Sequence, residues 1–154
     1  MGVRTAAAAR ALLTAGVVVA LDQATKQWAV NAIARGESEN VFFLLDLTNT
    51  RNKGVAFGVL EGGGVLVGML ISAALALLLV YFAFNADRRG LWLPVGMLVG
   101  GALGNLADRA RDGAVTDFID PAAWPAFNLA DAAVVLGVLG LLYVAEGSRE
   151  ARSP

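Results

Sequence analysis

Residues 62–86, GGGVLVGMLISAALALLLVYFAFNA, contain no charged side chain over 25 consecutive positions. At a rise of about 1.5 Å per residue, a helix of this length crosses a hydrocarbon core of about 30 Å. The whole chain of 154 residues is 57% hydrophobic and only 16% charged, whereas soluble domains carry about 25% charged residues. These features predict an integral membrane protein.

Four segments have the apolar character of membrane-spanning helices. We expect these helices at about residues 6–33, 64–85, 91–109 and 126–145. The basic start and short apolar core of the first segment also fit a cleaved signal peptide, but DQATKQWAV (22–30) continues the helical pattern instead of supplying a cleavage site. We therefore predict one membrane-embedded domain over residues 1–154.

The orientation of the helices follows from the distribution of Lys and Arg, which concentrate in the cytoplasmic loops of membrane proteins. The arginines on the amino-terminal side of the predicted bundle are Arg4, Arg10, Arg88, Arg89, Arg149 and Arg152. The outer loops carry fewer basic residues over a longer stretch. Both termini are therefore predicted to be cytoplasmic.

The segment between the first two predicted helices, residues 35–63, is too long for a simple connection. NVFFLLDLTNT (40–50) is rich in strand-forming residues, RNKG (51–54) is typical of a turn, and VAFGVL (55–60) resumes the apolar pattern. We predict a small β-hairpin on the outer membrane surface and a glycine hinge at 62–64. The predicted fold class is an all-α integral membrane protein with four transmembrane helices and a small β-rich extracytoplasmic subdomain.

Four carboxylates from separate parts of the chain are predicted to converge near the outer leaflet. By helical rise, Asp22 lies roughly 24 Å along the first helix and Asp108 roughly 26 Å along the third, while Asp131 lies about 8 Å from the outer end of the fourth. Asp117 falls in the short loop that joins the last two helices. Because charged groups inside a bilayer are costly and are functional candidates by default, we expect the chemistry at this level.

Several of these residues also have a purely structural interpretation. Asp22 and Lys26 are four residues apart and can neutralise each other on one helix face. Asp108 and Arg109 can form an ion pair at a helix end. The acids interpreted as solvated loop residues are Asp112 and Asp120.

Asp131 fits a structural role less well, because no cation lies within one helical turn of it. Asn105 and Asp108 are three residues apart, as are Asn128 and Asp131, so each pair places an amide and a carboxylate on one helix face. The glycines that allow close helix contact on the way to this region are Gly96, Gly100 and Gly104.

The chain contains no His and no Cys. This excludes Ser–His triads, Cys nucleophiles and most zinc sites, and it favours Asp as the catalytic residue type. Two neighbouring carboxylates share a proton, so that one takes a proton from water while the other polarises a carbonyl and later protonates the leaving amine. Asp117 and Asp131 are the pair that we select, positioned by the amides of Asn105 and Asn128.

Five motifs occur in order along the chain: LDQATK (21–26), TRNKGVAFGVL (50–60), GGALGNLADR (100–109), GAVTDFID (113–120) and FNLADAAVVLG (127–137). In sequence, order and spacing they resemble the lipoprotein signal peptidases (signal peptidase II), over nearly the whole chain. The resemblance implies an intramembrane aspartyl endopeptidase of the bacterial inner membrane, with its site near the outer leaflet. It implies cleavage of prolipoproteins just before a Cys that carries diacylglycerol, and inhibition by globomycin.

Carried over by residue, the resemblance implies that Asp117 and Asp131 are the catalytic dyad. The other positions that match polar motif residues of the family are Asp22, Lys26, Asn52, Asn105, Asp108, Arg109 and Asn128. Gly54, Ala56 and Phe57 match an outer loop that closes over the substrate, although Val55 stands where the family has a small residue. No metal, cofactor or nucleic-acid partner is expected.

Two other functions are compatible with the composition. A Mg²⁺-dependent lipid-headgroup transferase would use Asp108, Asp112, Asp117 and Asp120 as ligands, because hard cations prefer several carboxylates. The arginine distribution argues against it, since it places these acids on the outer side of the membrane, whereas such a site would more naturally face nucleotide substrates in the cytoplasm. A small proton-coupled transporter would use the acids as proton carriers, but it gives no reason for the long outer loop.

Overall fold

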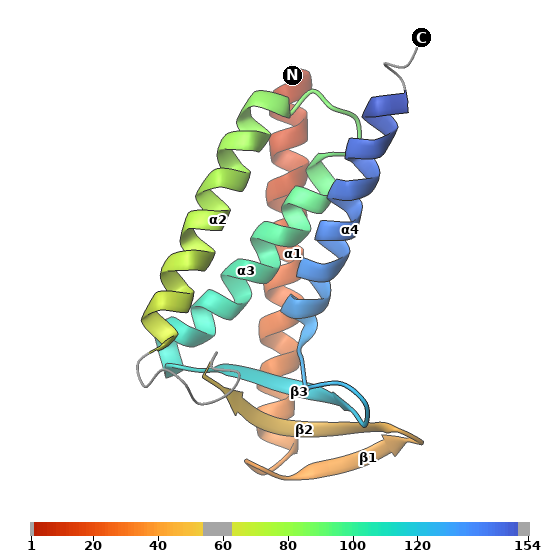
Figure 1. Ribbon diagram of the computed structural model, residues 1–154. Helices are drawn as coiled ribbons and strands as arrows, with labels where there is room; N and C mark the ends of the chain where they lie inside the picture. Colours follow the sequence, from red (N-terminus) through yellow and green to blue (C-terminus); the bar gives the residue numbers. More distant parts are fainter. Residues whose placement is uncertain (1, 54–62, 151–154) are drawn as a thin grey trace.

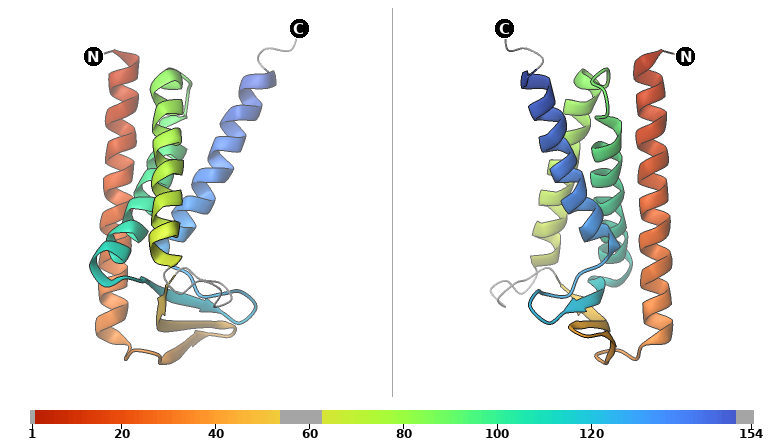
Figure 2. Two further views of the ribbon diagram at one scale, coloured as in Figure 1. Left: turned by 60° about the vertical axis from the view of Figure 1, so that its left-hand side comes forward. Right: turned by 90° about the vertical axis from the view of Figure 1, so that its right-hand side faces the viewer.

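A computed structural model describes residues 2–53 and 63–150 of the chain, and within them it shows four helices and one three-stranded antiparallel sheet (Figure 1). The helices are α1 (Val3–Ala32), α2 (Gly63–Asn85), α3 (Trp92–Asp112) and α4 (Leu129–Glu150). The strands are β1 (Ser38–Phe42), β2 (Leu45–Asn52) and β3 (Val115–Pro121). The start of α1 and the end of α4 lie at one end of the bundle, and the sheet lies across the other end (Figures 1 and 2).

Three helical segments of the described chain are long and apolar enough to cross a membrane: Val3–Ala32, Gly68–Asn85 and Leu129–Gly147. The helix α3 does not belong to this group. Its last five residues, 108–112, include two acids and two arginines. The prediction of a mostly helical chain with a small β-rich part is therefore confirmed. The prediction of four transmembrane helices is not, because three of the described helices have the length and apolar character of membrane spans.

The helix ends differ from the predicted ones at the site. The helix α3 continues to Asp112, three residues beyond the prediction, and ends where Gly113 adopts a left-handed conformation with φ of 70°. Asp112 is thus a helix residue and not the predicted loop acid. The helix α4 begins at Leu129 rather than near 126 and continues to Glu150.

The start of α4 is fixed by reciprocal hydrogen bonds of the capping-box type. The Asp131 backbone N–H donates to Asn128 Oδ1 at 3.0 Å, and the Asn128 backbone N–H donates to Asp131 Oδ2 at 3.3 Å. The three-residue spacing of Asn128 and Asp131 is therefore the spacing of a helix cap.

The predicted hairpin exists, but its turn lies at Phe43 and Leu44, between β1 and β2. The prediction of a turn at 51–54 is wrong for Arg51 and Asn52, which belong to β2. The predicted glycine hinge is also wrong at Gly63 and Gly64, because α2 already begins there. The VAFGVL segment lies outside the described residues.

The third strand was expected to be a loop. Val115–Pro121 pairs antiparallel with β2, with Thr50 opposite Asp117 and Asn52 opposite Val115. The pairing satisfies backbone groups of residues that are largely buried, which an irregular loop could not do. Asp120 is therefore a partly buried strand residue and not a solvated loop acid.

The helix α3 packs against both α1 and α4, and glycines let these helices approach closely (Figure 2). A Cβ atom at Gly100 would lie 2.7 Å from Val18 Cβ, and one at Gly104 would lie 2.5 Å from Asp22 Oδ2. The predicted close contact at the glycine series is confirmed. It brings Asp22 of α1 beside the polar end of α3.

Candidate active site

A buried ion cluster ties α1 to α3. Lys26 Nζ lies 2.8 Å from Asp22 Oδ2 and 3.1 Å from Asp108 Oδ2, and it donates to Asn105 Oδ1 at 2.8 Å. The side chains of the two acids are 0% exposed and that of Lys26 is 3% exposed. The predicted Asp22–Lys26 pair therefore exists, and a second carboxylate shares the same ammonium group.

The two acids of this ion cluster also hold neighbouring backbone segments. Asp22 Oδ1 accepts from the Ala130 backbone N–H at 3.0 Å, and Asp108 Oδ2 accepts from the Thr116 backbone N–H at 3.2 Å. Gln23 Nε2 donates to Asp108 Oδ1 at 2.9 Å. The ion cluster thus fixes two elements relative to α1 and α3. These are β3, which carries Asp117, and the first turn of α4, which carries Asp131.

Asp117 lies in β3 and is 2% exposed. Asn128 Nδ2 donates to its Oδ1 at 2.7 Å, and Asn52 Nδ2 donates to its Oδ2 at 3.0 Å. Burial raises the pKa of Asp117 above the ordinary range of an aspartate, the nearby charge of Asp131 raises it further, and the two amide donors partly oppose this shift. A raised pKa favours the protonated acid form of Asp117.

Asp131 lies in the first turn of α4 and is only partly buried. Asn105 Nδ2 donates to its Oδ1 at 2.8 Å, in addition to the cap bond from Asn128 to its Oδ2. Asn105 therefore contacts Lys26 through its oxygen and Asp131 through its nitrogen. Asn128 Nδ2 also lies 3.2 Å from Asn105 Oδ1.

The four acids expected at one level do converge. Hydrogen bonds through Asn105 and Asn128 connect the ion cluster of Asp22 and Asp108 with the pair Asp117 and Asp131. The prediction of convergence is confirmed by these contacts.

Arg109 occupies a different position from the one expected. It does not pair with Asp108, which contacts Lys26 and Arg111 instead. Adjacent residues on a helix point in different directions, whereas residues three apart share a face. Arg109 Nη1 donates to the Asn105 backbone oxygen at 3.4 Å, and its buried Nε has no hydrogen-bond partner among the described residues.

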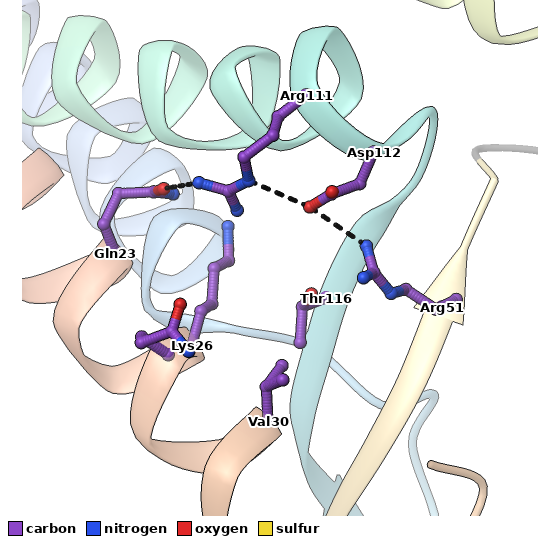
Figure 3. Close-up of a pocket in the computed structure, with 8 residues that line it drawn as sticks. Gln23, Lys26, Val30, Arg51, Arg111, Asp112 and Thr116 are labelled. Atoms are coloured by element: carbon purple, nitrogen blue, oxygen red, sulfur yellow. Dashed lines mark hydrogen bonds and ion pairs between the residues drawn. The ribbon is translucent and has the colours of Figure 1, made fainter.

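A polar pocket of about 300 Å³ opens beside the ion cluster (Figure 3). At its edge Asp112 Oδ2 lies 3.0 Å from Arg111 Nε and 3.2 Å from Arg51 Nη1, so that Asp112 links the end of α3 to β2. Arg111 Nη1 also donates to Gln23 Oε1 at 3.1 Å. Sequence reasoning did not select Gln23, Arg51 or Arg111, although Gln23 and Arg51 lie inside the LDQATK and TRNKGVAFGVL motifs.

The remaining predicted site residues are Gly54, Ala56 and Phe57, and they lie outside the described residues.

The chain matches a family model described as signal peptidase (SPase) II over residues 14–145. It is 42% identical over 134 residues to a lipoprotein signal peptidase of Moorella thermoacetica, an alignment that covers 86% of this chain and 89% of that protein. It is 41% identical over 142 residues to a lipoprotein signal peptidase of Syntrophomonas wolfei, with 89% and 94% covered.

Two solved structures described as bacterial membrane enzymes have a similar fold. One has a TM-score of 0.81 at 32% identity, and the alignment covers 88% of this chain and 91% of the chain in that structure. The other has a TM-score of 0.83 at 30% identity, with 93% and 91% covered. The fold and the matching family model are thus those of a membrane peptidase. The chain belongs to the signal peptidase II family.

Proposed function

We propose that the chain is an intramembrane aspartyl endopeptidase that removes the signal peptide from diacylglyceryl-modified prolipoproteins, cutting just before the lipidated Cys. The family and the names of the curated relatives support the lipoprotein signal peptide as substrate. The observation that carries the aspartyl mechanism is the pair Asp117 and Asp131, which both accept hydrogen bonds from Asn128. The nearby charge of Asp131 also contributes to the raised pKa of Asp117.

In this proposal the two carboxyl groups share one proton. Asp117 holds it, because burial and the charge of Asp131 raise its pKa. The carboxylate of Asp131 takes a proton from water as the water oxygen adds to the carbonyl carbon of the scissile bond, and Asp117 donates a hydrogen bond to the carbonyl oxygen. The C–N bond then breaks as Asp117 passes its proton to the leaving nitrogen. The products are a carboxylic acid and a new amino terminus, and the pair again holds one proton, the one that Asp131 took from water.

The remaining family positions support this pair. Asn52, Asn105 and Asn128 orient the two carboxylates by hydrogen bonds. The ion cluster of Asp22, Lys26 and Asp108 is a supporting structure beneath them. Arg109 is a candidate for substrate contact, because its half-buried guanidinium has a nitrogen without a partner among the described residues. Gly54, Ala56 and Phe57 are proposed to lie in a loop that closes over the substrate.

We also propose that α3 is a fourth membrane span. Its 21 residues extend about 30 Å, and it packs against α1 and α4, two apolar helices long enough to span a membrane. With Arg4, Arg10, Arg88 and Arg89 at the end opposite the sheet, the termini lie in the cytoplasm of a bacterial inner membrane and the dyad lies near the outer leaflet. The lipid anchor of the substrate would hold the scissile bond at that depth.

The acids required for a Mg²⁺ transferase are engaged elsewhere. Asp108 contacts Lys26 and Arg111, Asp112 contacts two arginines, and no group of three or more potential metal-binding side chains gathers among the described residues. No specific contact favours proton transport. Inhibition by globomycin is proposed from the family resemblance, as is the absence of a cofactor requirement.

The test compares cleavage of a purified diacylglyceryl prolipoprotein in detergent, with EDTA present, by the wild type and by Asp117→Asn and Asp131→Asn. Each variant should lose about 10²–10⁴-fold in rate, because each removes an acid or base of the reaction. Asp120→Asn, three residues further along the same strand, is the control and should cleave at the wild-type rate. Cleavage retained by either dyad variant would refute the assignment, and no cleavage by the wild type would refute the substrate.

A further inference from the structure

The sheet ends in a set of exposed apolar side chains, which we call the apolar tip. It comprises four residues of the hairpin and one residue of the segment between β3 and α4. Their exposed fractions are 57% for Val41, 75% for Phe42, 84% for Phe43, 61% for Leu44 and 70% for Trp124. The Ala122 backbone N–H donates to the Leu44 backbone oxygen at 2.9 Å and joins the two segments. Contiguous exposed apolar surface of this kind marks an interaction site.

The turn itself is unusual in its choice of residue. Phe43 has a φ of 44°, which places it in the left-handed region, and it is the first of only two residues between β1 and β2. Hairpin turns of this length favour Gly, Asn or Asp at such a position, and a bulky side chain there is strained. The turn therefore carries an aromatic group at a conformational cost, which folding of the sheet alone does not explain.

The position and charge of the tip identify the surface that it fits. The strands run across the bundle axis, so the tip projects sideways from the same end of the helices that carries the site (Figure 1). Residues 36–50 contain three acids and no Lys or Arg, so attraction to anionic lipid or nucleic acid does not explain the exposed aromatic groups. Trp and Phe beside apolar neighbours suit the interface of a bilayer, where aromatic rings gather.

We propose that the apolar tip inserts into the outer leaflet beside the helix bundle and anchors the sheet there by burial of apolar surface. Trp124 lies in the segment between β3 and α4, so the tip is connected through a short stretch of chain to an apolar helix long enough to span a membrane. It reaches the site through the sheet, because Leu45 pairs with Pro121 at the tip and Thr50 pairs with Asp117 in the same two strands. The tip thereby fixes the depth of Asp117 relative to the outer leaflet, a consequence that rests on the proposed function.

The insertion can be measured without any assay of cleavage. The chain has no cysteine, so Phe43→Cys, Glu39→Cys and Leu139→Cys each introduce a single site for a nitroxide label. Glu39 is an exposed polar residue of the same hairpin, and Leu139 is 57% exposed on the apolar helix α4. The labelled full-length chains are reconstituted in phosphatidylcholine vesicles, and collisions with oxygen, which partitions into lipid, are compared with collisions with a water-soluble nickel chelate.

The ratio of oxygen to nickel collisions at position 43 should approach that at 139 and exceed that at 39 severalfold, with no decrease at high salt. A ratio at position 43 that matches position 39 would overturn the proposal, because the tip would then lie in water. Protection of position 43 from both reagents would also overturn it, because it would indicate contact with protein, such as a second copy of the chain. The result is independent of the dyad, so failure here leaves the proposed hydrolysis intact.

Discussion

Two groups of acids lie within one connected network, and they differ in their partners. Asp22 and Asp108 each contact the ammonium group of Lys26, and both are fully buried. Asp117 and Asp131 accept hydrogen bonds from uncharged amides, and no cation contacts either one within the described part of the chain. The first two are compensated charges and the second two are not.

This difference indicates which acids can react. A buried carboxylate that is paired with a cation mainly supports the fold, because removal of either partner leaves the other charge buried and unpaired. A buried carboxylate with only neutral donors and a second acid nearby has a raised pKa, as Asp117 does, and can exchange a proton during a reaction. The comparison therefore separates structural from reactive acids by partner rather than by position in the sequence.

Lys26→Met tests the compensated group and should have the largest effect on stability. It leaves Asp22 and Asp108 buried without their cation, which costs about 3–5 kcal/mol in the free energy of unfolding. The measurement is equilibrium unfolding in detergent. Lys53→Met is the control, because Lys53 is exposed and its loss should change stability by no more than about 0.5 kcal/mol. Equal effects of the two substitutions would contradict the buried cluster.

Gly104→Ala disturbs the same cluster from the backbone. The added Cβ would lie 2.5 Å from Asp22 Oδ2, so Asp22 or the helix must shift, at a cost of about 1–3 kcal/mol. Gly16→Ala is the matched control: nothing lies within 4 Å of a Cβ at that position of α1, and replacing glycine there should stabilise the helix by about 0.5–1 kcal/mol. Thermal unfolding of both variants checks the difference, and a stable Gly104→Ala would argue against the close helix contact.

Asn52→Ala addresses the uncompensated pair through the pH dependence of cleavage. The Asn52 amide stabilises the ionised form of Asp117 and so lowers its pKa. Without this donor the pKa of Asp117 rises further, and the pair keeps its shared proton to higher pH. The alkaline limb of the pH–rate profile should therefore move to higher pH.

Asn40→Ala is the control for this shift, because the Asn40 amide contacts Asp46 at 2.6 Å and not the dyad. Its profile should match that of the wild type. An alkaline limb that stays in place, or moves to lower pH, in Asn52→Ala would show that Asp117 is not the proton holder.

Asp112→Asn should have the smallest effect. Asp112 contacts Arg51 and Arg111 at the edge of the pocket, where water weakens ion pairs. Cleavage should continue at the wild-type rate and the melting temperature should fall only slightly. A loss of cleavage as large as that of the dyad variants would make Asp112 part of the reactive group.

The sequence predicts the class of protein and the convergence of the four acids, because uncharged runs define helices and helical rise sets the depth of each residue. The sequence did not predict β3, because a strand of seven residues in the segment between two helices resembles a loop until its partner strand is known. That partner is β2, more than sixty residues earlier. Nor did it identify Gln23 or Arg111, because their roles depend on the contact between α1 and α3 and leave no periodic pattern in the sequence.

The amide of Asn105 has a directional consequence. Its oxygen faces Lys26, which can only donate hydrogen bonds, so its nitrogen must face Asp131. Rotation of the amide by half a turn would place its N–H donors against the ammonium group of Lys26, which is also a donor. It would place the amide oxygen against the carboxylate of Asp131, which is also an acceptor. The charge of Lys26, buried in the contact between α1 and α3, therefore fixes the orientation of the Asn105 amide, and this orientation presents a donor to Asp131.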